Sequence, residues 1–95
     1  MLFAIHALDP PNGLERRLAH YDAHRAFLPS AGEFGVALVM SGPLVADDGA
    51  TMVGSLLVVE AADRASVERF NAADPFAKGG VWEHVTITAF LRRQG

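Results

Sequence analysis

The feature of this sequence that most constrains its fold is a series of short apolar segments, each ended by turn-forming residues. Four of them span Leu2–Leu8, Phe34–Leu44, Met52–Glu60 and Glu83–Leu91. Apolar runs of this length, bounded by Gly, Pro, Asn or Asp, predict β-strands. The second and third are joined by a short connection that contains Asp47-Asp48-Gly49, and this turn signal predicts an antiparallel hairpin.

A longer segment between the first two strands has helical periodicity. Over Leu14–Ala31, residues spaced three and four apart form one stripe, namely Leu14, Leu18, Tyr21, Arg25 and Leu28. Asn12 is expected to cap this helix by accepting a hydrogen bond from a free backbone N–H. Pro29 and Gly32 are expected to end the helix or to distort its last turn.

A second helix is predicted between the last two strands. Ser66 is a suitable cap, and the helix should stop near Asp74-Pro75, because a residue before proline is driven out of helical conformation. The order β-α-β-β-α-β is that of a ferredoxin-like α+β fold, an antiparallel four-stranded sheet with two helices on one face. At 95 residues, the chain is expected to form a single domain over residues 1–95.

The predicted sheet leaves one face without helices. That face would expose Val, Leu, Ile and Phe side chains to water unless another surface packs against it. The composition agrees, since 51% of the residues are hydrophobic, against about 45–50% in typical globular domains. We therefore expect a homodimer in which the open sheet faces of two copies pack together.

Charge and composition argue against several classes of function. Lys and Arg number 8 against 11 Asp and Glu, which gives a formal net charge of −3, and there is no basic run. Binding to nucleic acid or to an anionic membrane is therefore not expected. The absence of cysteine excludes disulfides, thiolate metal sites and cysteine nucleophiles. No apolar stretch approaches the ~18–20 residues of a membrane span, and the first residues lack signal-peptide features, so a cytoplasmic location is expected.

His24 is the first candidate for chemistry. It lies at the edge of the predicted helical stripe, and Arg17 lies two turns earlier on the same flank. Together they would offer a titratable base and an anion-binding cation to one small cavity. A histidine in such a position can also be a hydrogen-bonded structural residue, and this alternative stays open.

Asp74 is the second candidate. Its carboxylate could hold the imidazole of His24 in one tautomer and stabilise the imidazolium, as an Asp does in a catalytic triad. The alternative is a helix terminator, because Asp before Pro is a common start of a turn. The expected topology permits contact between His24 and Asp74 but does not require it.

Two small-residue motifs lie on either side of the turn in the predicted hairpin. Ser41-Gly42-Pro43 ends the second strand, and Gly54-Ser55 lies near the start of the third. The glycines would let a ligand approach the backbone closely, and the serines could donate hydrogen bonds to an oxyanion. The alternative is a hairpin whose glycines serve only turns and bulges.

Other polar and aromatic residues carry weaker signals. His20 and His24 have i, i+4 spacing, but the glutamate of the HExxH zinc motif is missing, so no metal is expected. The sequence also lacks a glycine-rich phosphate-binding motif, so no organic cofactor is expected. Trp82 and Phe76 are expected in the core, although either could close over a planar substrate. The acidic residues at strand ends and loops, Asp9 among them, are expected to be solvated.

Several short motifs are spread along nearly the whole chain: Arg17, His24 and Leu28, then Ser41-Gly42-Pro43, Gly54-Ser55, Asp74-Pro75-Phe76 and Gly80-Val81. In their order and spacing they resemble the YCII family of small dimeric α+β barrel proteins. The resemblance implies a ferredoxin-like fold, a dimer, and an active site built from His24 and Asp74, with Arg17, Ser41 and Gly42 lining the cleft. Elimination of halide from chlorinated hydroquinones is the activity associated with the family, but a fold does not fix a reaction.

We therefore expect a small-molecule enzyme of the proton-transfer or elimination type, with dehydrochlorinase-like lyase activity on an oxygenated or aromatic compound. His24 would be the general base, Asp74 its orienting partner, and Arg17 or the Ser41 region the anion stabiliser. Two other hypotheses stay open. One is a non-catalytic module that binds a small ligand in the same cleft, and the other is a structural dimer whose polar pair only completes the fold.

Overall fold

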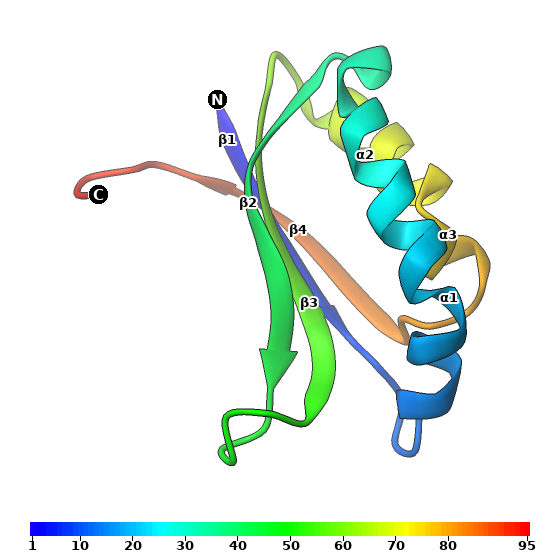
Figure 1. Ribbon diagram of the computed structural model, residues 1–95. Coiled ribbons are helices and arrows are strands. Elements are labelled where there is room, and N and C mark those ends of the chain that lie inside the picture. The colour runs from blue at the N-terminus through cyan, green and yellow to red at the C-terminus, as the bar shows by residue number, and fades with distance from the viewer.

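The computed structural model describes all residues, 1–95, and has the predicted order of strands and long helices (Figure 1). The elements are β1 (Leu2–Leu8), α1 (Leu14–Phe27), η1 (Leu28–Phe34), β2 (Val36–Val45), β3 (Met52–Ala61), α2 (Arg64–Ala73), α3 (Pro75–Lys78) and β4 (His84–Phe90). Two short segments were not predicted: η1, which is a 3-10 helix, and α3, a single helical turn.

The four strands form one antiparallel sheet in the order β2-β3-β1-β4. The N-terminal strand β1 is therefore central, paired with β3 on one side and β4 on the other. All the helices lie on one side of the sheet, as Figure 1 shows. The predicted ferredoxin-like α+β architecture is thus confirmed.

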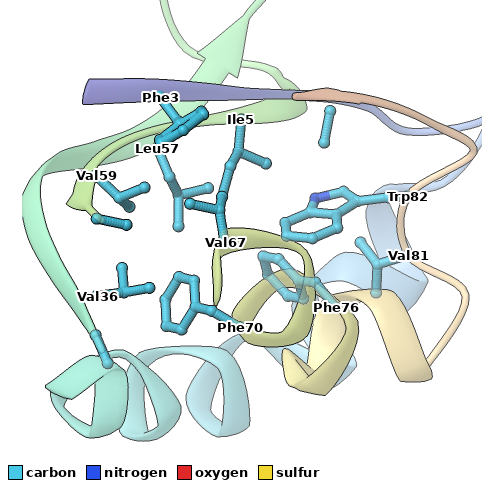
Figure 2. Close-up of a cluster of buried hydrophobic side chains, with 13 residues drawn as sticks. Phe3, Ile5, Val36, Leu57, Val59, Val67, Phe70, Phe76, Val81 and Trp82 are labelled. Carbon is cyan, nitrogen blue, oxygen red and sulfur yellow. The ribbon is translucent and has the colours of Figure 1, made fainter. Parts of the chain in front are cut away.

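The hydrophobic core fills the space between the sheet and the helices. Phe3, Ile5 and Ala7 alternate along β1, so all three face the helices, and none is more than 3% exposed. Phe70 of α2 and Phe76 of α3 belong to the same buried cluster (Figure 2). Burial of such aromatic side chains holds α2 and α3 against the sheet.

The buried side of α1 differs from the predicted apolar stripe. Leu14 and Leu18 are exposed, Leu18 to 55%, whereas Arg17 and His24 are buried. The reason is that both polar side chains find buried hydrogen-bond partners, which offsets the cost of removing them from water. The helix therefore turns a polar pair, two turns apart, toward the interior.

The caps of both long helices also correct the prediction. Asn12 does not cap α1, because its backbone adopts a φ of 62° and Gly13 occupies the cap position with no side-chain hydrogen bond. The cap of α2 is Asp63, whose carboxylate accepts a hydrogen bond from the N–H of Ser66. As a result, α2 begins at Arg64, before the predicted Ser66 cap.

The end of α1 follows the expectation for proline. The helix ends at Phe27 and continues as the tighter η1, because Pro29 has no N–H to donate to a carbonyl of the preceding turn. Gly35 then adopts a φ of 73° and redirects the chain into β2. At 14 residues α1 is the longest helix, and none is long and apolar enough to cross a membrane.

A β-bulge in β2 decides which of its side chains face the helices. The register shifts between Leu38 and Met40, which leaves Val39 as an extra residue. Beyond the bulge, Ser41 pairs with the buried Leu57 of β3 and therefore faces the helices. Without the extra residue, Met40 would take that place, because side chains alternate along a strand.

The opposite face of the sheet has no covering element (Figure 1). By the strand register, Leu8, Met40 and Phe90 lie on this open face, with exposed fractions of 40%, 57% and 49%. The chain that follows β4 also runs away from the helices. A sizeable apolar surface is thus left in contact with water.

Candidate functional site

His24 and Asp74 meet between α1 and the junction of α2 with α3. Nδ1 of His24 lies 2.8 Å from Oδ1 and 2.9 Å from Oδ2 of Asp74. Both residues are buried, His24 to 7% exposure and Asp74 to 1%. Because a carboxylate only accepts hydrogen bonds, Nδ1 carries the proton and donates it. The neutral ring then has its free lone pair on Nε2, which has no hydrogen-bond partner within the chain.

Asp74 holds this place because it joins two helices. It precedes Pro75 and has extended backbone angles, φ −63° and ψ 131°, so α2 ends there. Its Oδ1 also accepts a hydrogen bond from the N–H of Phe76, at 2.9 Å, and so caps α3. The helix-terminator and histidine-partner hypotheses are therefore compatible: one carboxylate ends α2, caps α3 and receives Nδ1–H of His24.

Aromatic rings fix the plane of the imidazole. Phe76 stacks on His24 with ring centroids 4.0 Å apart and an angle of 4° between the planes. Trp82 meets the His24 ring edge-on at 6.2 Å. Both aromatics are buried in the core, where Figure 2 shows them side by side. The carboxylate contact sets the tautomer, and this packing restricts rotation of the ring.

Arg17 lies in a second buried polar cluster beside the same phenyl ring. Its Nε and Nη2 donate to the carboxylate of Asp9 at 2.7 and 3.2 Å, and Nη2 also donates to Oγ of Ser55 at 2.7 Å. The indole N–H of Trp82 donates to the same Oγ at 3.2 Å. The guanidinium carbon of Arg17 is 4.7 Å from the centroid of the Phe76 ring.

Asp9 corrects one expectation, since it was predicted to be solvated. Its side chain is only 4% exposed and pairs with Arg17, whose side chain is 1% exposed. An Asp that follows a strand and precedes Pro10-Pro11 is typical of a turn, so no local signal in the sequence predicts its burial. The contact forms because the turn after β1 leads directly into α1, whose first turns place Arg17 beside the end of β1.

Four of the five residues expected in the site line one cavity of about 230 Å³, namely Arg17, His24, Ser41 and Gly42. Asp74 does not line it and reaches it only through His24. Tyr21 and Arg25 of α1 also line this cavity and were not predicted as site residues. A larger hollow of about 520 Å³ lies beside residues 10–13 and contains none of the five.

The histidines do not gather into a metal site. No group of three or more His, Asp or Glu side chains lies close enough together to hold a metal ion. Nδ1 of His20 contacts the carbonyl oxygen of Arg16 at 2.9 Å, and His20 does not line the cavity beside His24.

Two carboxyl groups outside this cavity have lowered pKa values. The hydroxyl of Thr51, then its N–H and that of Ala50, donate to Asp48 and lower its pKa to about 2. The N–H of Ser66 donates to Asp63 and holds the pKa of that carboxyl below its usual value, with help from the Ser66 hydroxyl. Both carboxyl groups are exposed, so their lowered pKa values arise from local hydrogen bonds, in a turn for Asp48 and at a helix cap for Asp63.

The fold and these motifs define a known class of protein. The YCII-related domain matches residues 1–91, and the chain belongs to the YCII family. Two relatives, each called Protein YciI, come from Escherichia coli O6:H1 and from Shigella flexneri. Each is 34% identical to this chain over 97 residues, which cover 97% of this chain and 98% of the relative.

A solved structure with the same fold is that of 5-chloro-2-hydroxyhydroquinone dehydrochlorinase (TftG) from Burkholderia phenoliruptrix AC1100, in complex with 2,5-dihydroxybenzoquinone. The TM-score is 0.84 and the sequence identity is 31%, over 98% of this chain and 96% of that one. The similarity extends over nearly the full length of both chains, so the expected resemblance to the YCII family is confirmed.

Proposed function

We propose that this chain is an enzyme that takes a proton from a small oxygenated or aromatic molecule and eliminates a leaving group, with His24 as general base and Asp74 as its orienting partner. The observation that carries the proposal is the 2.8 Å contact from Nδ1 of His24 to Asp74, beside a cavity that His24 itself lines. Proton abstraction needs a base held in one tautomer, with its second nitrogen free to reach the substrate.

In the proposed step, Nε2 of His24 accepts a proton from the substrate. The electron pair of the broken bond forms a new π bond, and the leaving group departs as an anion with its own bonding pair. The Asp74 carboxylate stabilises the imidazolium that results. The substrate thus loses one proton and one anion, which together make hydrogen halide when the leaving group is a halide.

Size and lining of the cavity support a small, oxygen-bearing substrate. Its volume of about 230 Å³ is below the roughly 300–1,000 Å³ of sites for drug-sized ligands. The Ser41 hydroxyl and the Gly42 backbone offer polar contacts along one wall. The likeness to a dehydrochlorinase makes 5-chloro-2-hydroxyhydroquinone the first compound to test.

The test compares His24→Gln with the wild type on this compound, with released chloride as the readout. Glutamine keeps polarity and approximate size but removes the base, so we expect turnover to fall by about 10²–10⁴-fold. Binding of 2,5-dihydroxybenzoquinone, measured by calorimetry, should persist. His20→Gln is the matched control, because it makes the same change on the same helix outside the cavity. Full turnover by His24→Gln would exclude His24 as the base; wild-type binding without turnover would favour the non-catalytic module.

We also propose that two copies associate through the open sheet face. The apolar side chains on this face, including Leu8, Met40 and Phe90, support the proposal because no element of the chain covers them. A second copy is a suitable partner, since a two-fold axis would bring the same apolar surface from both subunits into contact.

A further inference from the structure

We infer that Arg25 is a substrate-binding residue that selects molecules bearing an ionised oxygen, such as an enolate or a phenolate. The inference rests on the proposed function, because it specifies the class of molecule that the cavity beside His24 accepts. It comes from a contrast between the two arginines that line this cavity, Arg17 and Arg25.

The charge of Arg17 is already balanced within the protein. Its guanidinium makes two hydrogen bonds to the buried Asp9 carboxylate and a third to Ser55. A buried, bidentate ion pair of this kind fixes both partners and contributes no net charge to its surroundings. Arg17 is therefore suited to holding the wall of the cavity in place, and less suited to neutralising an incoming anion.

The charge of Arg25 is not balanced. Arg25 is exposed, lines the same cavity, and makes no ion pair with any carboxylate of the chain. Its guanidinium carbon lies 5.5 Å from the centroid of the Tyr21 ring. Packing against an aromatic ring restrains a guanidinium while leaving N–H donors free for a ligand. Arg25 is also the neighbour of His24 in sequence, so the free cation and the base reach one cavity from the same turn of α1.

The proposed chemistry requires such a cation. Removing a proton from a neutral hydroxyl places negative charge on the substrate oxygen until the leaving group departs with it, and a substrate that binds already ionised brings that charge with it. No Asp or Glu lines the cavity, so nothing there competes for Arg25. A guanidinium can bind two oxygens at once, which suits a ring with neighbouring oxygen substituents.

A purely structural role for Arg25 predicts something different. A cation in the last turn of a helix stabilises it through the helix dipole, and Arg25 lies in the last turn of α1. In that role, Arg25→Lys would be equivalent to the wild type and Arg25→Gln would only lower the melting temperature. If Arg25 binds substrate, both variants should lose affinity for the ligand. Arg25→Lys should lose less, because lysine keeps the positive charge but lacks the paired N–H donors of a guanidinium.

The test is calorimetric binding of two probes to the full chain. The first is 2,5-dihydroxybenzoquinone, whose enolic hydroxyls ionise readily because the charge spreads onto the carbonyl oxygens. The second is 2,5-dimethoxy-1,4-benzoquinone, which has the same ring but cannot ionise. Arg93→Gln is the matched control, since it removes one positive charge at an exposed position that none of the described cavities includes.

We expect the wild type and Arg93→Gln to bind the dihydroxy probe alike and more tightly than the dimethoxy probe. Arg25→Gln should lose about tenfold or more in affinity for the dihydroxy probe alone, with Arg25→Lys between them. Equal affinity of Arg25→Gln and the wild type would overturn the inference, as would no binding by the wild type. Chloride release distinguishes the two proposals. If the wild type releases chloride and Arg25→Gln binds the dihydroxy probe as tightly as the wild type does, only the role of Arg25 is rejected. If the wild type releases no chloride but Arg25→Gln selectively loses binding of the dihydroxy probe, only the catalytic proposal is rejected.

Discussion

Nδ1 of His24 lies 2.8 Å from Oδ1 of Asp74, although 50 residues separate them along the chain. This one contact connects α1 to the junction of α2 with α3. The same Oδ1 accepts the N–H of Phe76, whose ring stacks on His24. Three residues therefore support one another's positions, and truncation of any of them to alanine should lower both the stability and the proposed activity.

Substitutions of Asp74 should separate its two roles. Asp74→Asn keeps an oxygen that can cap α3, so the melting temperature should stay near that of the wild type. Chloride release should still fall by about 100-fold or more, because the negative charge that stabilises the imidazolium is lost. Asp74→Ala should lose turnover and also unfold more easily, by about 1 kcal/mol for the cap and about 1–3 kcal/mol for the unpaired imidazole. Equal turnover in Asp74→Asn and the wild type would contradict the proposed role.

The buried pair of Arg17 and Asp9 should be important for stability. Asp9→Ala leaves the guanidinium of Arg17 buried without a counter-charge, and we expect a loss of about 3–5 kcal/mol in the free energy of unfolding. Urea denaturation followed by tryptophan fluorescence measures it, since the single Trp82 donates to the same serine as Arg17. Asp22→Ala, at an exposed position on α1, should change stability by less than about 0.5 kcal/mol. Similar effects from both substitutions would show that the pair is not important.

The cap of α2 should give a pH-dependent contribution. The folded pKa of Asp63 is depressed, so its stabilising effect is fully present above the ordinary Asp pKa of 3.8 and is lost as pH falls through the depressed pKa. Asp63→Ala should therefore lower the melting temperature at pH 7, and the gap from the wild type should narrow as pH falls below 4. Glu68→Ala, at an exposed position on the same helix, should show no such narrowing. A constant gap across this pH range would refute the assignment.

The proposed dimer can be tested with two matched surface changes. Met40 on the open sheet face is 57% exposed and Leu18 on α1 is 55% exposed, so a glutamate at either position should leave the monomer fold intact. Light scattering should give about twice the monomer mass for the wild type and for Leu18→Glu, and a shift toward the 10.1 kDa monomer for Met40→Glu. A monomeric wild type at micromolar concentration would end the dimer proposal.

The order of elements could be predicted because it depends on local periodicity and turn residues. Strands such as Leu2–Leu8 are apolar runs closed by Asp, Pro, Asn and Gly, and these signals do not depend on distant parts of the chain. The stripe on α1 was partly wrong because periodicity treats Leu18 as a core residue and cannot recognise that Arg17 has a buried partner. Hydrophobic periodicity predicts only the burial of apolar side chains, whereas the interior of this protein also contains the ion pair of Arg17 and Asp9.

The candidate site was predictable only in part, for a related reason. The resemblance indicated His24, Asp74, Arg17, Ser41 and Gly42, and the structure brings four of them to one cavity with Asp74 behind His24. Asp9 was missed because its contact depends on the path of the turn after β1. Helical periodicity places Arg25 in the apolar stripe, and nothing in the sequence shows which arginine has its charge already neutralised.

The extra residue Val39 determines which side chains of β2 face the helices and which face the open side of the sheet. An odd-numbered insertion or deletion in the stretch from Val36 to Ser41 would exchange the inward and outward sets of side chains beyond it. The hydroxyl of Ser41 would then turn to the bare side of the sheet, and the thioether of Met40 would enter the wall beside His24. Single-residue changes in strand length can therefore alter the chemistry of this wall abruptly, in a way that point substitutions elsewhere in the strand cannot reproduce.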